Sequence, residues 1–504
     1  MKKILKNALI IATAITIVSG CKPEDFGDIN LSPNSPSTPQ TYLLLTSAER
    51  YLGRTTAVTS TATAPGVINE YAAKLYTQQL SENLYTSESR YNTKVYSYNG
   101  IYNSPLQDLT TIINLNTDAV SKGAPNVIGG GSNANQIAAA RILKAFYFQN
   151  MTDRWGDIPY SQALKGKEFL TPVFDKQQAV YTSLFKELKE AAAQFDSGAT
   201  LKGDILFSGS VVKWKKFAAT IRLNMALRLS KKDPATGRTE FNAAIADGVI
   251  TSNADNVVYT HLAEAANENS IYYNYEVNKR YDYSISKTLV DAMNAINDPR
   301  IAVYADKTSA GTYAGMPYGL TQALAGASYN PGTVTSPGNV SLIGRAFRSQ
   351  NSPVRIFTYP EVLLTIAEGY KLGWITGAPD DTQAAVSYNN AINASFTLNG
   401  VTAPANYFTQ ADVAYDSANG IKKIITQKWI ANYMGYAVEA WSDWRRTGFP
   451  VLSPSPYPQN IGGKIPVRQG YTTDEASLNN ANYQAVIASQ GPDELNTPVW
   501  WNKP

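Results

Sequence analysis

The sequence is almost devoid of cysteine and histidine. Its 504 residues include one cysteine, Cys21, and one histidine, His261. A single cysteine cannot form an internal disulfide bond, so a disulfide-stabilised scaffold is excluded. A single histidine excludes zinc sites that need several histidines and leaves few routes to histidine-based nucleophilic catalysis. Because no serine-elbow motif accompanies it, we interpret His261 as a structural or surface residue.

A strong charge of one sign is missing as well. Lys and Arg number 44 and Asp and Glu number 40, a formal net charge of +4 without a dense basic run. We therefore predict no nucleic-acid partner. The glycine-rich phosphate loops, the zinc-protease motif, the serine-hydrolase elbow and the EF-hand loop are also missing, so no cofactor or metal ligand is predicted. A structural calcium ion is left open, because carbonyl-rich calcium sites leave little trace in a sequence.

Long hydrophobic runs are missing too. The apolar stretch Ala8–Val18 follows three lysines and is shorter than the ~20 residues of a membrane-spanning helix, so residues 1–20 are predicted to be a secretory signal peptide. They end in Val18-Ser19-Gly20 before Cys21, which looks like the lipobox of bacterial lipoproteins, where the thiol receives a diacylglyceryl group. An ordinary signal peptide with a chance cysteine is disfavoured, because this is the only cysteine. We predict a lipid anchor at Cys21 and a Pro/Ser/Asn-rich tether over residues 21–40.

Removal of the signal peptide would change the charge balance. Three of the 44 basic residues would go with it, which leaves 41 against 40 acidic residues. A nearly neutral protein suits an uncharged ligand better than nucleic acid or anionic lipid. The acidic residues Glu24, Asp25 and Asp28 resemble the surface-export signal of Bacteroidetes lipoproteins, so we expect the protein to face the cell exterior.

Helical periodicity is abundant. Apolar residues recur at helical spacing in five stretches, which are Ala139–Phe146, Val180–Phe195, Trp214–Met225, Leu363–Trp374 and Ile421–Trp429. Paired helices stacked as in a tetratricopeptide array fit this spacing, although the tetratricopeptide consensus is missing. Residues 123–135, 305–355 and 448–473 are predicted to be irregular, and loops of this length are typical of binding surfaces. With no clean boundary, we predict one mostly helical domain over residues 41–504, with a few short strands.

Tyrosine is unusually frequent, with 32 residues against 15 phenylalanines. Two polar stretches concentrate these rings, around residues 85–102 and 272–283. Aromatic faces with interleaved Asn and Arg side chains match the apolar faces and hydroxyl rims of sugars, and peptides use similar surfaces. The predicted ligand-binding residues are Tyr85, Tyr91, Tyr96, Tyr98, Tyr272, Tyr273, Asn274, Tyr275, Arg280, Tyr281 and Tyr283. In the alternative interpretation, most of these rings pack against neighbouring helices.

A pair of carboxylates keeps an enzymatic alternative open. Glu439 and Asp443 lie four residues apart in a predicted helix, and a glycosidase needs two carboxylates that flank one bond. Arg445 and Arg446 follow closely, so ion pairing explains the two carboxylates at least as well as catalysis does. We favour a protein that is not an enzyme, and we keep a lipid-anchored glycoside hydrolase as the rival.

Several motifs together resemble one family, the SusD/RagB nutrient-binding outer-membrane lipoproteins, in particular the SusD-like branch. Beyond the lipobox, these motifs are Asn30–Pro36, Asp153–Ala163, Trp214–Lys231, Asn297–Arg300, Thr358–Trp374, Gln427–Pro450, Ile465–Arg468 and Val499–Trp501. The similarity extends from Cys21 nearly to Pro504, and the order and spacing of the motifs make it specific. In our interpretation Trp441, Trp444, Arg445 and Arg446 pack in the scaffold, because ligand choice varies across the family.

The resemblance implies a fold and a role. Such proteins look like mostly helical domains in which tetratricopeptide-like helix pairs form a superhelical scaffold with long loops. They are held on the cell surface by their lipid and close like a lid over a TonB-dependent barrel of the SusC/RagA type. They capture oligosaccharides, or peptides in some branches, and deliver them for import without being enzymes. A purely structural helical-repeat adaptor is a further alternative. The ligand-facing residues are not part of the shared motifs, so the tyrosine assignment depends on composition and loop setting alone.

Overall fold

The computed structural model describes residues 38–54, 57–58, 63–64 and 70–503. The predicted signal peptide, Cys21 and the tether up to residue 37 lie outside the described residues. The helices are α2 Thr41–Arg50, α3 Tyr71–Tyr76, α4 Asn99–Ile101, α5 Gln107–Thr117, α6 Pro125–Ile128, α7 Asn133–Trp155, α8 Gln177–Gln194, α9 Val211–Arg228, α10 Pro234–Asp247, α11 Ser270–Tyr272, α12 Lys287–Ala295, α13 Ile301–Tyr304, α14 Gln322–Ser328, α15 Tyr359–Lys371, α16 Asp381–Leu398, α17 Gly420–Ala431, α18 Ala437–Thr447, α19 Thr473–Leu478 and α20 Asn480–Gln490.

The strands are few and short. They are β1 Ala57–Val58, β2 Thr63–Ala64, β3 Leu80–Glu82, β4 Ile158–Pro159, β5 Phe174–Asp175, β6 Val257–Tyr259, β7 Tyr283–Ile285 and β8 Val354–Phe357. They form two-stranded antiparallel pairs, β1 with β2, β3 with β7, β4 with β5 and β6 with β8. The predicted mostly helical fold with a few short strands is confirmed.

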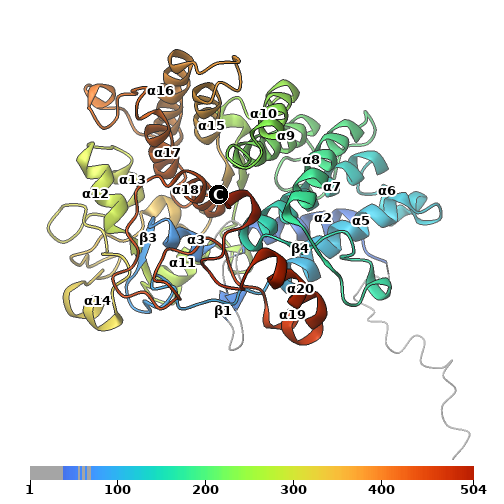
Figure 1. The fold of residues 1–504 in the computed structure, drawn as a ribbon, viewed down its shortest axis with the longest axis horizontal. Helices are drawn as coiled ribbons and strands as arrows, with labels where there is room; N and C mark the ends of the chain where they lie inside the picture. Colours follow the sequence, from blue (N-terminus) through green and yellow to red (C-terminus); the bar gives the residue numbers. More distant parts are fainter. Residues whose placement is uncertain (1–37, 55–56, 59–62, 65–69, 504) are drawn as a thin grey trace, which may run out of the picture.

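Successive long helices pack as hairpins, α7 with α8, α9 with α10 and α15 with α16. Contacts of α8 with α9 and of α9 with α15 join one pair to the next. Figure 1 shows the resulting arc, from α5 and α7 at the right through α9 and α10 to α15, α16 and α17 at the top left. This array is the tetratricopeptide-like scaffold that the helical periodicity favours.

Local sequence explains where these helices begin. The Ser132 hydroxyl accepts a hydrogen bond from the backbone N–H of Asn135 at the start of α7. Thr358 and Glu361 form a capping box at the start of α15, with Pro360 in its first turn. Such caps satisfy backbone donors that the first turn leaves free. All five predicted apolar stretches lie in α7, α8, α9, α15 and α17, although Phe195 and Trp374 lie just beyond the ends of their helices.

Two predicted loops contain more helix than expected. Residues 123–135 include α6 and the first turn of α7, because Pro125 and Ser132 supply helix-start signals within a Gly/Asn-rich stretch. Residues 305–355 include α14 and the start of β8. By contrast, residues 448–472 contain no helix or strand, as their prolines indicate.

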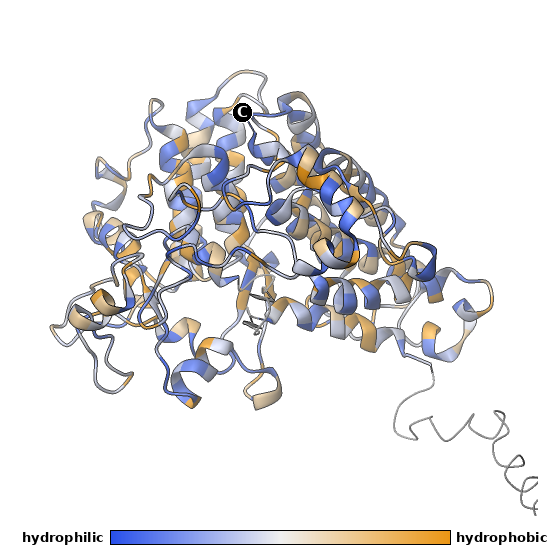
Figure 2. Cartoon of the chain, turned by 60° about the horizontal axis from the view of Figure 1, so that its bottom comes forward, coloured by the Kyte–Doolittle hydropathy of each residue, from blue (hydrophilic) through white to orange (hydrophobic). Residues whose placement is uncertain are grey.

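The described residues form two large hydrophobic clusters and a small third one around Met316. One lies among α2, α5, α7, α8 and α9 and contains Trp155, Trp214 and Trp441. The other lies among α12, α15, α16 and α17. The half-buried Tyr318 contacts both clusters, so they adjoin. Figure 2 shows hydrophobic and hydrophilic residues mixed along most helices, as expected for helices that bury one face. Among the described residues, no helix combines the length and apolarity needed to cross a bilayer.

Candidate ligand-binding site

Strand pairing brings the two tyrosine-rich segments together. β3 and β7 are antiparallel, with Glu82 opposite Tyr283. Just beyond the strands, the Asn83 side-chain amide donates a hydrogen bond to the carbonyl oxygen of Tyr281 at 2.7 Å, across 198 residues of sequence. Because this pairing fixes both backbones, the residues that follow β3 and those that precede β7 lie close together.

Two of the predicted rings are well exposed in this region. Tyr85 and Tyr273 are 55% and 47% exposed. The guanidinium carbon of Arg280 lies 5.3 Å from the centre of the Tyr85 ring. An ion pair of 2.9 Å with Asp282 holds the Arg280 guanidinium in turn. Arg280 therefore joins one tyrosine cluster to the other, and Tyr85 is held in place while much of it contacts solvent.

Four further predicted residues are half-buried beside these rings, namely Tyr272, Asn274, Tyr281 and Tyr283. The Asn274 side-chain amide donates to the Asp282 carboxylate at 3.1 Å. The Tyr283 ring stacks on Tyr71 with ring centres 4.6 Å apart. Each of these four side chains therefore exposes part of its surface to solvent, and the contacts with Asp282 and Tyr71 hold Asn274 and Tyr283 in place.

The segment is built on an unusual turn. The Asn269 side chain accepts hydrogen bonds from the backbone N–H groups of Ile271 and Tyr272 at the start of α11. A π-helical stretch, η8 (Tyr273–Val277), follows directly. Lys279 then adopts a left-handed conformation with φ of 55°. π-Helical turns and left-handed non-glycine residues are both enriched at functional sites.

A pocket of about 560 Å³ adjoins the segment. Its wall includes Tyr272 and Glu276 on one side and Val334, Arg345, Arg348, Ser349 and Gln350 on the other. Arg348 is held by Glu276 at 2.7 Å and by Asp306 at 2.6 Å, so it forms part of the framework. Arg345 is exposed, and none of the described carboxylates pairs with it. It is a polar group that a ligand can reach.

The sequence analysis did not predict the individual residues of the pocket wall that faces Tyr272 and Glu276. Val334, Arg345 and Gln350 belong to the 305–355 stretch, whose length alone indicated a binding surface. The Gln350 side-chain amide donates to the Glu268 carboxylate at 2.9 Å, which links this stretch to the segment before α11. No local pattern marks these side chains, because the loop acquires its position from contacts with distant segments.

Four of the predicted ligand-binding tyrosines need correction. Tyr91, Tyr96, Tyr98 and Tyr275 are all buried. Their hydroxyls bond within the protein: that of Tyr98 donates to Glu475 at 2.7 Å, that of Tyr91 accepts from the Ser455 N–H at 2.9 Å, and that of Tyr275 donates to the Tyr283 carbonyl. Tyr96 shares hydrogen bonds with Tyr76 and Glu88. These rings are core residues, as the packing alternative proposed, because each ring is buried and each hydroxyl has a hydrogen-bond partner within the protein.

Comparison with known proteins now identifies the family. A sequence model of SusD-like proteins, described as "Starch-binding associating with outer membrane", matches residues 33–472. The chain belongs to the SusD-like family. The resemblance inferred from the sequence motifs is thereby confirmed. A search of curated protein sequences finds no significant match.

Solved structures with the SusD-like fold cover nearly the whole chain. A structure titled a chitin-binding protein is 26% identical, with a TM-score of 0.72, and covers 92% of this chain and 100% of its own. A SusD homologue from Bacteroides fragilis is 23% identical, with a TM-score of 0.75, over 92% and 100% of the two chains. A chitin-binding SusD homologue from Flavobacterium johnsoniae is 23% identical, with a TM-score of 0.70, over 92% and 98%.

The motifs that this SusD-like chain displays are mainly structural. The guanidinium carbon of Arg445 lies 3.8 Å from the centre of the Trp441 ring and 4.6 Å from that of Trp501. The Trp501 indole N–H donates to the Asp153 carboxylate at 3.0 Å. Of the predicted packing residues, Trp441, Arg445 and Arg446 are buried, and Trp444 is half-buried against the same hydrophobic cluster, so the packing role of this tryptophan–arginine motif is confirmed. The motif joins α18 and the C-terminal segment to α7.

The carboxylate pair of the enzymatic alternative is closed off from solvent. Glu439 and Asp443 are 3% and 8% exposed. Glu439 pairs with Arg228 at 2.6 Å, and Asp443 pairs with Lys428 at 2.9 Å. Burial alone would raise the pKa of Asp443, but Lys428 and Arg446 lower it to about 2. Both carboxylates are occupied by cations, so the pair does not flank an open cleft.

The described residues contain no group of three or more His, Cys, Asp or Glu side chains placed to hold a metal ion.

Proposed function

We propose that this protein is a cell-surface lipoprotein that binds oligosaccharides and passes them to a TonB-dependent outer-membrane barrel for import. The observation that carries the proposal is the junction of β3 and β7. It places the exposed Tyr85, with Arg280 against its ring, in the same region as Tyr273, and it lies near the pocket beside Tyr272.

The chemistry of this surface suits a neutral sugar. Exposed tyrosine faces can cover the apolar faces of sugar rings, while Arg280, Asn274 and Arg345 can donate to hydroxyl groups. Two structures with this fold are titled chitin-binding, one of them 26% identical to this chain. Chitin oligosaccharides are therefore the first ligands to test.

The proposed membrane anchor and transporter partner are supported by the sequence and by family membership. The lipobox-like segment ending at Cys21 favours a lipid anchor, and the acidic residues after it favour the cell exterior. The family description places such proteins at the outer membrane. The SusC/RagA-type barrel is the partner that family membership implies. Binding and transfer break no bond, so we infer that the protein is not an enzyme.

A binding screen tests the proposal. The mature chain with Cys21→Ser is titrated by calorimetry with chitin, starch and other oligosaccharides and with a peptide panel. Saturable binding of an oligosaccharide that falls in Tyr85→Ala supports the proposal. Binding of peptides alone would replace the sugar with a peptide ligand, and binding of neither would favour the structural adaptor. Co-purification of the native lipoprotein with a TonB-dependent barrel tests the partner.

A further inference from the structure

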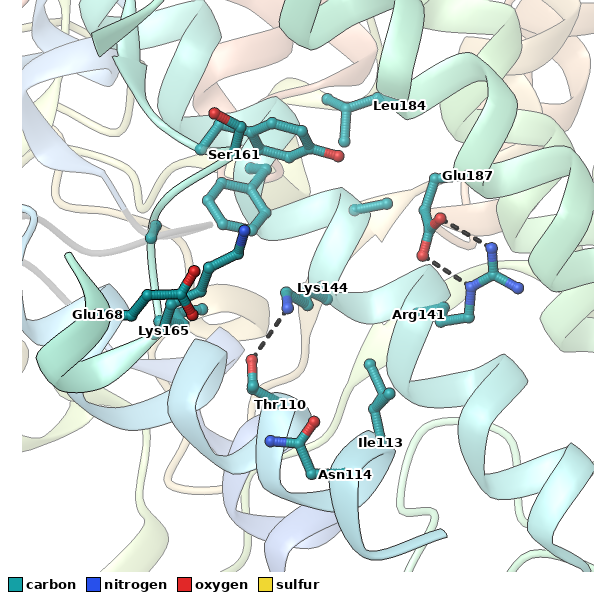
Figure 3. A pocket seen from close by; sticks show the side chains of 15 residues that line it. Thr110, Ile113, Asn114, Arg141, Lys144, Ser161, Lys165, Glu168, Leu184 and Glu187 are labelled. Atoms are coloured by element: carbon teal, nitrogen blue, oxygen red, sulfur yellow. Dashed lines mark hydrogen bonds and ion pairs between the residues drawn. The ribbon is translucent and has the colours of Figure 1, made fainter. Parts of the chain in front are cut away.

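A second cavity, of about 730 Å³, lies among the helical pairs and does not include Tyr85, Tyr273 or Arg280 in its lining. It is bounded by α5, α7, α8 and the loop that follows β4. The side chains that matter for its chemistry are Thr110, Asn114, Lys144, Phe148, Tyr160 and Leu184. Figure 3 shows Lys144 near its centre, the Arg141–Glu187 pair on one side and Lys165 with Glu168 on the other. A volume of this size accommodates one or two sugar units.

The charges around this cavity are unevenly compensated. Arg141 donates two hydrogen bonds to Glu187, at 2.7 and 2.8 Å, and a third to Glu190 at 3.0 Å. Lys144 donates to the hydroxyl of Thr110 at 3.0 Å, but within the described part of the chain no carboxylate lies within 4.0 Å of its ammonium group. Burial lowers the pKa of Lys144, and Glu187 opposes this only in part. A partly buried cation without a counter-charge favours the entry of an anion.

The wall opposite Lys144 is held rigidly. The backbone N–H groups of Tyr160 and Ser161 donate to the Asp175 carboxylate at 3.0 and 2.8 Å. Leu164, on the same loop, has a φ of 65°, a left-handed conformation that such a residue rarely adopts. Backbone strain of this kind persists where the surrounding structure enforces it, and it is enriched at ligand sites.

The cavity also has an apolar wall, large enough to cover one sugar ring, beside the Lys144 ammonium group. The Phe148 and Tyr160 rings meet edge to face with their centres 4.8 Å apart. Leu184, Ile113 and Ala145 extend this apolar wall. Tyr160, Ser161 and Ala163 belong to the Asp153–Ala163 motif, and the proposed function leaves this end of the motif without a role.

We propose that this cavity binds a carboxylate-bearing sugar unit, that is, a uronic acid. Its carboxylate lies on the Lys144 ammonium, with the Asn114 amide as a further donor, and its ring packs against Phe148 and Leu184. The site is distinct from the surface around Tyr85, and it selects an acidic sugar where that surface suits a neutral one. A charge-assisted hydrogen bond to a partly buried ammonium is the source of the selectivity.

The test compares glucuronate, glucose and acetate as ligands of the mature chain with Cys21→Ser. We expect glucuronate to bind about tenfold more tightly than glucose or acetate, because a hydrogen bond to a charged group contributes about 1.5–3 kcal/mol. Chemical-shift changes and calorimetry follow the titration. Glucose binding as tightly as glucuronate, acetate binding as tightly as glucuronate, or no measurable glucuronate binding would each overturn the proposal.

Two variants locate the site. Lys144→Met removes the ammonium while keeping the length of the side chain, and we expect it to abolish the preference for glucuronate. Asn114→Asp places a carboxylate at an exposed position of α5 and should weaken glucuronate binding about tenfold without affecting folding. The matched control is Lys167→Met, an exposed lysine of the same loop that does not line the cavity. Unchanged glucuronate binding in both Lys144→Met and Asn114→Asp, or equal loss in the control, would refute the assignment.

Discussion

The guanidinium of Arg280 lies against the ring of Tyr85, with its central carbon 5.3 Å from the ring centre. The two residues belong to the two separate tyrosine-rich stretches of the sequence, and only the pairing of β3 with β7 brings them together. The contact fixes an exposed aromatic ring beside a cation, an arrangement that suits a polar ligand with an apolar face.

The first prediction concerns the two exposed rings. Tyr85→Ala and Tyr273→Ala are each expected to weaken oligosaccharide binding about tenfold, since a lost aromatic contact costs roughly 1–1.5 kcal/mol. Because both rings are exposed, the melting temperature should change little. Calorimetric titration and thermal unfolding check the two expectations. Tyr370→Ala, in the half-buried part of α15, is the control, and equal loss of binding there would argue against this surface.

The second prediction concerns the buried rings. Tyr98→Ala is expected to lower the free energy of unfolding by about 3–5 kcal/mol, because it removes a core ring and leaves Glu475 without its hydroxyl partner. Tyr275→Ala should act in the same direction. Denaturant unfolding measures the effect. A variant that keeps full stability but loses ligand would return these tyrosines to the binding site.

The third prediction concerns pH. Burial raises the pKa of the Glu82 carboxyl from 4.5 to about 8, although hydrogen bonds from Ser89 lower it. The folded protein therefore holds a proton that the unfolded chain releases, so this group's contribution to stability is complete below pH 4.5 and is lost as the pH rises toward 8. Over this window the wild type should lose up to about 1.4 kcal/mol per pH unit relative to Glu82→Gln. Unfolding curves at several pH values measure the difference, with the exposed Glu168→Gln as control. Parallel pH profiles of the wild type and Glu82→Gln would contradict this assignment.

The fourth prediction separates binding from hydrolysis. Incubation of the protein with oligosaccharides should release no new reducing ends. Glu439→Ala should instead destabilise the fold by about 3–5 kcal/mol, because it leaves the buried Arg228 without one of its carboxylates. Reducing-end assays and denaturant unfolding measure these outcomes. Hydrolysis that disappears in Glu439→Ala while the protein stays folded would restore the glycosidase alternative.

The fifth prediction concerns the anchor. Cys21→Ser should release the protein from membranes and abolish the incorporation of labelled lipid, because the thiol is the proposed attachment point. Membrane pelleting of the variant and of the unchanged protein provides the comparison. Continued pelleting with labelled lipid would show a different anchor.

Much of the scaffold could be predicted from the sequence. The five apolar stretches lie in five observed helices because helical periodicity and start signals such as Thr358 and Glu361 act within a few residues. The family also follows from the sequence, because its motifs preserve an order and spacing. The structure adds that Arg445, Trp441 and Trp501 in these motifs pack together in the core.

The candidate site could be predicted only in outline. Tyr85 and Tyr96 occur in the same polar stretch, yet one is exposed and the other is buried against Tyr76 and Glu88. Their difference in exposure comes from contacts with residues far along the chain or across a turn, which composition does not encode. The same holds for Arg345 and for Lys144, whose surroundings are assembled from separate segments.

The sequence by itself determined the helical class and the family, because each depends on local pattern or on the order of motifs. It also predicts a secretory signal, whose removal would leave 41 basic against 40 acidic residues. Only the tertiary structure decided which tyrosines meet solvent, that the two tyrosine-rich stretches adjoin, and that the Glu439–Asp443 pair is sealed by cations. Burial and ion pairing depend on residues that are far apart in the sequence and meet only in the folded protein. The packing of the whole chain decides which of them meet, so no local sequence pattern can show it.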